Sequence, residues 1–183
     1  MAGANAKTWL IVGASRGIGH EFATQLLNRG DKVFVTVRKP GIEHDVAYWT
    51  DAKAEPSHFA QKLLKAGIPV GTIVFISSDS GSVSAFREHE DGFAAYGASK
   101  AALNVMARHM AAELKRKGSR TTILMLHPGE VRTDMAKIED LDWEVEGQME
   151  PQESVAACIE TVESKGPDDS GTFWTWRNEP YPW

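Results

Sequence analysis

Short apolar runs alternate with longer, mixed segments along this chain. Apolar runs of this length are typical of buried strands, and five such strands are predicted over residues 8–12, 31–37, 71–77, 120–126 and 172–176. Segments with helical character and end signals predict helices over residues 20–29, 56–65, 93–117 and 151–164. Residues 41–54 show no clear period and are predicted to be loop. Strands that alternate with helices indicate the α/β class, with a doubly wound parallel sheet.

Tyr96 and Lys100 stand four residues apart in an alanine-rich predicted helix. That spacing places both side chains on one helix face, about one turn apart. An ammonium beside a phenol favours the phenolate by charge and by hydrogen bonding, so the pair is suited to proton transfer. Taken alone, such a pair is more often two solvated side chains on a surface helix. The rest of the chain has to decide between these interpretations.

A glycine-rich turn directly follows the first predicted strand. Residues 13–19 read Gly-Ala-Ser-Arg-Gly-Ile-Gly and lead into a predicted helix. In this context the glycines let the backbone approach a pyrophosphate, which the helix N-terminus also faces. The alternative is a tight strand-to-helix turn without a ligand. Farther along, the strand before the alanine-rich helix ends in two hydroxyls, Ser77 and Ser78, which could also simply cap the strand end.

In this order, the segments 13–19, 76–78 and 96–100 resemble the short-chain dehydrogenase/reductase family. Residues 99–104, the His-Pro-Gly segment 127–135 and the tail 171–183 narrow the resemblance to the C-factor and sniffer-like carbonyl reductases. The resemblance covers residues 8–38 and 71–183. It implies one Rossmann-like domain over residues 1–183, and an NADP(H)-dependent enzyme that acts on a carbonyl or alcohol of a small organic substrate.

The resemblance also assigns catalytic roles to Ser78, Tyr96 and Lys100. Tyr96 would donate a proton to the carbonyl oxygen, Lys100 would favour the phenolate, and Ser78 would orient the substrate. The cofactor-binding positions it implies are Gly13, Ser15, Arg16, Gly17, Ile18, Gly19, Arg38, Pro128, Gly129, Val131 and Thr133.

NADP is the predicted cofactor because of the residues near the second strand. In this family a basic residue in the glycine-rich turn and another after the second strand mark a site for the 2′-phosphate, and Arg16 and Arg38 hold these positions. No acidic residue follows Val37, where an NAD-preferring member would bind the ribose hydroxyls. For Thr133, an alternative role is that of a helix N-cap.

The chain differs from the family that it resembles between Arg38 and Val70, because the relatives have several tens of additional residues in this interval. There the relatives have two further strands, one ending in Asn-Asn-Ala-Gly, and a helix Asn that completes a catalytic tetrad; neither is present here. We therefore expect a shortened sheet of about five strands in the order 2-1-3-4-5, with helices on both faces, and weakened or lost NADP binding.

An alternative is a redox-silent enzyme that uses the same Ser, Tyr and Lys for a cofactor-independent isomerisation, dehydration, epimerisation or cyclisation. A non-catalytic binding protein is less favoured.

Composition and charge exclude several classes. The net charge of −5 argues against broad electrostatic binding of nucleic acid. No apolar run approaches the roughly 18 residues of a membrane helix, and residues 1–7 lack the apolar core of a signal peptide. Cys158 is the only cysteine, which excludes an intrachain disulfide and fits a cytoplasmic location. The six histidines show no metal-ligand spacing, so no metal site is predicted.

The alanine-rich helix, residues 93–117, also predicts a homodimer. Small side chains permit close packing of a second helix, and relatives often associate through the corresponding helices. The alternative is that the alanines only pack on the sheet. They are Ala94, Ala95, Ala98, Ala101, Ala102, Ala107, Ala111 and Ala112.

Overall fold

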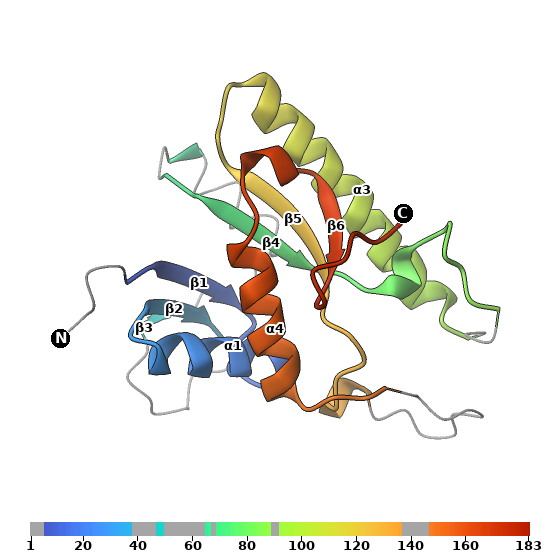
Figure 1. The fold of residues 1–183 in the computed structure, drawn as a ribbon, viewed down its shortest axis with the longest axis horizontal. Helices are drawn as coiled ribbons and strands as arrows, with labels where there is room; N and C mark the ends of the chain where they lie inside the picture. Colours follow the sequence, from blue (N-terminus) through green and yellow to red (C-terminus); the bar gives the residue numbers. More distant parts are fainter. Residues whose placement is uncertain (1–5, 38–46, 50–64, 67–68, 89–91, 137–146) are drawn as a thin grey trace. The chain divides into compact units, whose positions relative to one another are not determined.

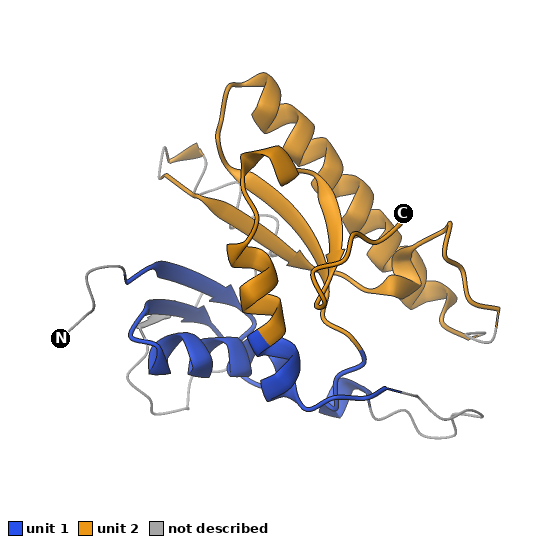
Figure 2. Cartoon of the chain, in the orientation of Figure 1, with its two compact units in different colours: residues 1–61, 130–156 blue, residues 62–129, 157–183 orange. Residues whose placement is uncertain are grey.

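The computed structural model describes residues 6–37, 47–49, 65–66, 69–88, 92–136 and 147–183 (Figure 1). The chain divides into two compact units (Figure 2). Unit 1 comprises residues 1–61 and 130–156, and unit 2 comprises residues 62–129 and 157–183. The single domain expected over residues 1–183 stays a prediction.

Unit 1 contains a three-stranded parallel sheet in the order β1-β2-β3. Its elements are β1 (Thr8–Val12), α1 (Gly17–Asn28), β2 (Lys32–Thr36), β3 (Ala47–Trp49) and η2 (Asp134–Ala136). The helix α1 packs against β1 and β2, and it buries Phe22, Ala23 and Leu26. In β2, Val33 and Val35 are buried, so the sequence pattern of one apolar helix face and an apolar strand has produced this small core.

Unit 2 contains a second three-stranded parallel sheet, in the order β4-β5-β6. Its elements are β4 (Thr72–Ile76), η1 (Asp79–Gly81), α3 (Ala94–Arg116), β5 (Thr122–His127), η3 (Pro167–Asp169) and β6 (Thr172–Thr175). All six residues of the central strand β5 are buried. The helix α3 packs on β5 (Figure 1). Its Ala107, Ala111 and Leu114 join the core cluster that includes Phe75 and Phe173.

The helices α1 and α3 end in the same way. Gly30 after α1 has φ +89°, and Gly118 after α3 has φ +71°, a backbone region that favours glycine. After α1, Gly30 N–H donates to Leu27 and Asp31 N–H donates to Leu26, which is the Schellman pattern. The predicted C-terminal ends of these two helices, at residues 29 and 117, are confirmed to within one residue. The helix α4 (Pro151–Glu163) has its first residues in unit 1 and the rest in unit 2.

The five predicted strands and the helices near 20–29, 93–117 and 151–164 are all present within a few residues, and the α/β class with parallel strands is confirmed. The loop prediction for residues 41–54 is wrong at β3, a sixth strand that pairs with the outer edge of β2. Three residues are too few to show a period, and the pairing decides their structure. Of the helix predicted over 56–65, residues 56–64 lie outside the described part of the chain. Among the described residues β1 pairs only with β2, so its expected pairing with β4 stays a prediction.

Candidate active site

Tyr96 and Lys100 lie one turn apart on α3, in unit 2. The Lys100 ammonium stands 5.5 Å from the centroid of the Tyr96 ring. Its Nζ also donates a hydrogen bond of 3.1 Å to the carbonyl oxygen of Ile76. Burial lowers the pKa of Lys100, whereas Tyr96 is 39% exposed. The helix therefore holds a fixed cation beside a phenol that solvent and small molecules can reach.

Two glycines set the distance between η1 and α3. A Cβ on Gly81 would lie 2.8 Å from Lys100 Cβ, and a Cβ on Gly97 would lie 2.8 Å from the carbonyl oxygen of Ser80. Such contacts are shorter than side chains tolerate, so both positions require glycine for this approach. The turn that carries Ser78 is therefore seated directly on the Tyr96–Lys100 segment of the helix.

Ser78 lies between β4 and η1 and is 7% exposed. Its Oγ accepts a hydrogen bond of 3.2 Å from Ser80 N–H and so caps η1. Its hydroxyl lies 2.9 Å from Asp79 Oδ1 and 3.3 Å from Ser80 Oγ. Ser78 thus begins the turn that packs on the Tyr96–Lys100 segment of α3, and its hydroxyl is engaged by the neighbouring Asp79; its catalytic role stays a prediction.

The neighbouring Ser77 has a structural partner. Its hydroxyl donates a 2.6 Å hydrogen bond to Oδ1 of Asn104, one turn after Lys100 on α3. Both side chains are buried, and Nδ2 of Asn104 has no hydrogen-bond partner within the described part of the chain. This bond fastens the end of β4 to the same helix that carries Tyr96.

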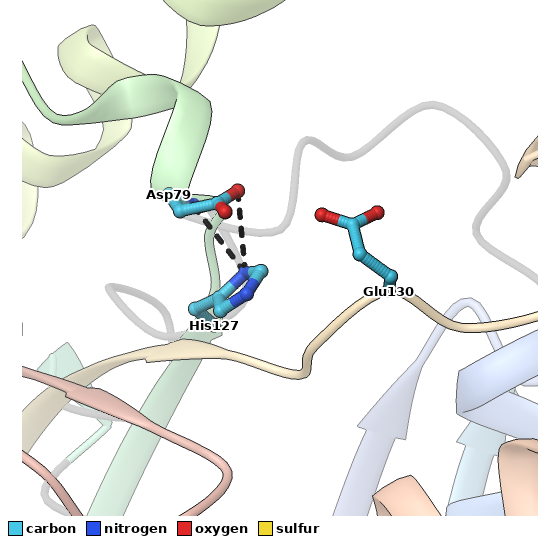
Figure 3. Close-up of side chains that lie close together, drawn as sticks. All are labelled: Asp79, His127 and Glu130. Carbon is cyan, nitrogen blue, oxygen red and sulfur yellow. Dashed lines mark hydrogen bonds and ion pairs between the residues drawn. The ribbon is translucent and has the colours of Figure 1, made fainter. Parts of the chain in front are cut away.

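Asp79 was not singled out from the sequence, yet it organises the turn after Ser78. Its carboxylate is buried and forms an ion pair of 2.8 Å with Arg87. Its backbone N–H donates to Nδ1 of His127, at the end of β5, over 3.3 Å. Figure 3 shows this pair, together with Glu130, which begins a segment of the other unit. Burial lowers the pKa of His127, Asp79 opposes this, and Arg87 reinforces it.

The glycine-rich turn lies in unit 1, between β1 and α1. Gly13 has φ +85°, and its N–H donates to the carbonyl and the hydroxyl oxygens of Thr36, at 3.2 and 3.1 Å. A Cβ on Gly19 would lie 2.4 Å from Gly13 O. The turn therefore packs so tightly against the start of the helix that only glycine fits at position 19.

The other predicted cofactor residues of unit 1 gather around this helix start. Arg16 is the N-cap of α1, and its side chain forms no cap hydrogen bond; Ser15 and Ile18 are partly buried. A Cβ on Gly17 would lie 3.5 Å from Thr133 Cγ2, so Thr133 stands beside the turn.

Three of the remaining predicted positions belong to the segment that follows β5. Val131 is buried and bridges to Met149. Pro128 and Gly129 follow β5 in unit 2, and Arg38 lies outside the described residues.

Comparison with known proteins decides the family. An uncharacterized oxidoreductase of Schizosaccharomyces pombe is 30% identical over 186 aligned positions, and the alignment covers 94% of this chain and 67% of that protein. The chain belongs to the short-chain dehydrogenase family. The family's sequence profile, described as short chain dehydrogenase, matches residues 56–142. This range includes Ser78, Tyr96, Lys100 and Thr133 and begins after the glycine-rich turn.

Two further relatives of this short-chain dehydrogenase bear on its fold and its length. A second oxidoreductase of S. pombe is 25% identical over 251 aligned positions, covering 96% of this chain and 98% of that protein. The alignment is longer than the 183 residues of this chain, so that relative carries residues with no counterpart here. A carbonyl reductase from Pseudomonas aeruginosa, solved in complex with NADP, is 25% identical with a TM-score of 0.68 and coverage of 98% and 100%. The predicted carbonyl reductase-like, Rossmann-like assignment is confirmed, and the chain is an oxidoreductase-type enzyme.

The described part of the chain contains no helix that is both long and apolar enough to cross a membrane.

Proposed function

We propose that this short-chain dehydrogenase is an NADP(H)-dependent reductase that acts on a carbonyl or alcohol of a small organic molecule through Ser78, Tyr96 and Lys100. The observation that carries the proposal is the anchoring of the Lys100 ammonium. It stands over the Tyr96 ring and is bound to the end of the strand that leads to Ser78. Proton-transfer residues need this kind of fixed, partly desolvated arrangement.

Tyr96 is the proposed proton donor. Its phenol is exposed enough to meet a substrate oxygen, and the phenolate left after proton transfer would lie beside a positive charge. A charge held in a partly buried position stabilises the phenolate more than a solvated one would. Ser78, seated against the same helix segment, is proposed to orient the substrate oxygen.

The residues of unit 1 fit a dinucleotide. The turn from Gly13 to Gly19 is closed too tightly for any other side chain at Gly19, and it leads into a helix whose N-cap forms no side-chain hydrogen bond. Such helix starts bind phosphate through their backbone N–H groups. Arg16 would add the charge that the 2′-phosphate of NADP requires. The nicotinamide, when bound, supplies or accepts the hydride.

Two observations support NADP as the cofactor, and a third supports weakened binding of NADP. The carbonyl reductase from P. aeruginosa was solved with NADP, and Arg16 is exposed at the start of α1. The chain lacks the Asn-Asn-Ala-Gly segment found in longer family members, so fewer contacts are expected at the adenosine end. Binding dominated by phosphate contacts should weaken as salt rises. The homodimer and the cytoplasmic location stay predictions.

The test is a pair of assays on wild type and Tyr96→Phe, each with and without NADPH, using a panel of small ketones and aldehydes. Removal of one acid–base group is expected to lower the rate about a hundred to ten-thousandfold. NADPH affinity, measured by calorimetry, should be equal in the two proteins and lower in Arg16→Ala. Unchanged turnover in Tyr96→Phe would refute the proton-transfer role. The absence of NADPH binding at millimolar concentration would refute the redox function.

A further inference from the structure

Three polar side chains form one stripe along α3. Tyr96, Lys100 and Asn104 follow one another at intervals of four residues, which places them on the same face of the helix. Along this stripe the side chains become less accessible, from an exposed phenol through a half-buried ammonium to an amide that is 2% exposed. The first two belong to the proposed site, and the buried amide continues the same face one turn beyond Lys100.

The amide of Asn104 is unfavourable for the stability of the core of unit 2. Its Oδ1 accepts a 2.6 Å hydrogen bond from Ser77, which is also 2% exposed, while its Nδ2 has no hydrogen-bond partner among the described residues. A buried donor without a partner lowers stability, and an apolar pair at these two positions would avoid that loss. The presence of an amide here therefore points to a role of its hydrogen bond in the site.

The bond between Ser77 and Asn104 lies beside the acceptor of Lys100. The peptide group between Ile76 and Ser77 supplies that acceptor, the carbonyl oxygen of Ile76, at 3.1 Å from Lys100 Nζ. The N–H of the same peptide group donates to the carbonyl oxygen of Leu126 on β5 over 2.8 Å. This one peptide group is thus bound to β5 by its N–H and to two successive turns of α3, through Lys100 and through the Ser77 side chain.

We propose that Asn104 is a positioning residue, which acts through Ser77 to keep the ammonium of Lys100 in place. Its hydrogen bond fixes the distance between α3 and the end of β4, and this distance decides whether the ammonium reaches the carbonyl oxygen of Ile76. The inference rests on the proposed function and adds a residue on which the rate depends. Without the bond, Lys100 keeps its charge but has to be ordered again in each turnover, so we expect kcat to fall about five- to thirtyfold.

The kinetic test compares two variants that lose this bond but differ in stability. Ser77→Ala leaves Asn104 without its partner and should unfold at a lower temperature than wild type. Ser77→Ala combined with Asn104→Leu replaces both polar groups, which is nearly neutral for stability. With benzaldehyde and NADPH, both variants should show the same fall in kcat and an unchanged KM for benzaldehyde. A kcat that follows thermal stability, or a wild-type kcat in either folded variant, would overturn the proposal.

Thr161→Val is the matched control in the same unit. The Thr161 side chain is also 2% exposed and donates a hydrogen bond of 3.2 Å, here to the carbonyl oxygen of Trp176. The loss of this bond should lower the stability and leave kcat at the wild-type value. An equal fall of kcat in Thr161→Val would mean that the loss of any buried hydrogen bond slows the enzyme, and it would overturn the role of Asn104.

NMR of the ¹⁵N-labelled lysine ammonium groups gives a readout that does not depend on turnover. The signals of Lys100 and of the exposed Lys115 are identified by their loss in Lys100→Met and Lys115→Met. The order parameter of the Lys100 ammonium should be high in wild type and in Thr161→Val. In both variants without the bond between Ser77 and Asn104 it should fall toward that of Lys115. An unchanged order parameter in those variants would overturn the proposal.

The two readouts separate this inference from the proposed function. If wild type reduces neither benzaldehyde nor any other member of the ketone and aldehyde panel, the proposed function fails, and with it the effect of Asn104 on the rate. A fall of the order parameter in the same experiment would still show that Asn104 holds the ammonium of Lys100. If wild type is active and the order parameter does not change, the positioning role fails and the proposed function stands.

Discussion

The ammonium of Lys100 donates a 3.1 Å hydrogen bond to the carbonyl oxygen of Ile76, the last residue of β4. This bond joins α3 to the strand end that leads to Ser78. The lysine is therefore fixed in position, although a lysine side chain carries about 2 kcal/mol of rotamer entropy when it is free. Fixed charges are the ones that stabilise a developing phenolate most.

Replacement of Lys100 by Met should therefore affect the rate far more than the fold. We expect Lys100→Met to lower kcat about a hundred- to a thousandfold, the cost of removing one fixed electrostatic partner. The aliphatic stem of Met should keep most of the packing. Lys115→Met, an exposed lysine in the last turn of the same helix, is the control and should keep wild-type kcat. Steady-state kinetics with NADPH would measure both, and equal rates for both variants would contradict the role of Lys100.

The pH dependence of stability should report on His127. Burial lowers the pKa of this histidine in the folded protein, below the ordinary value of 6.5. As the pH falls below 6.5, the unfolded chain takes up a proton that the folded chain does not, so the free energy of unfolding decreases. Above pH 6.5 both states are neutral at this residue and the full stability is present. Urea unfolding at pH 7.5 and 5.5 should show a smaller decrease for His127→Gln than for wild type.

A control separates His127 from the other titrating groups. His109→Gln changes an exposed histidine on α3 and should leave the wild-type decrease between the two pH values. Asp31 also carries a lowered pKa, since hydrogen bonds from Arg29, Lys7 and Trp9 outweigh the opposing effect of burial. Its contribution is lost only as the pH falls below 3.8, outside this window. An identical decrease in wild type and His127→Gln would contradict the prediction.

Local pattern was enough to predict most of the fold and part of the candidate site. The spacing of Tyr96 and Lys100 fixes their common helix face, and the apolar run Thr72–Ile76 places Ser78 at a strand end. These features depend on neighbours within a few residues, which a sequence shows directly.

The parts that could not be predicted depend on contacts between distant segments. Asp79 stands at the start of a polar stretch of the sequence, and its half-buried partner Arg87 belongs to a run of charged residues farther along this stretch. Its other partner, His127, comes 48 residues later. The strand β3 is three residues long and is formed by pairing with β2. The one available signal for Asp79 was its place directly after two serines at a strand end.

The face of α3 that does not join the core should mediate self-association. Ala107 and Ala111 are buried in unit 2, which agrees with the alternative that alanines pack on the sheet. The exposed residues of the helix include Ala94, Ala98, Ala102 and Ala112. Val105 on the same helix is 58% exposed. We expect a dimer in light scattering, and Val105→Glu should shift the mass toward the 20.1 kDa of one chain. A wild type of 20.1 kDa at all concentrations would remove the dimer prediction.

Substitution of Gly97 should test whether the close packing of η1 against α3 matters for activity. Alanine is a better helix former than glycine by about 1 kcal/mol, so Gly97→Ala would stabilise an unconstrained helix. Here its Cβ would lie 2.8 Å from the carbonyl oxygen of Ser80. We therefore expect a net destabilisation of about 1–3 kcal/mol, as for overpacked cores, and a larger relative loss of kcat, because the turn that carries Ser78 must move.

Gly71→Ala is the matched control: a Cβ there has no neighbour within 4 Å, and the variant should keep wild-type kcat. Chemical denaturation gives the stabilities and NADPH-linked turnover gives the rates. A stabilised, fully active Gly97→Ala would show that η1 can leave α3 without cost to the site.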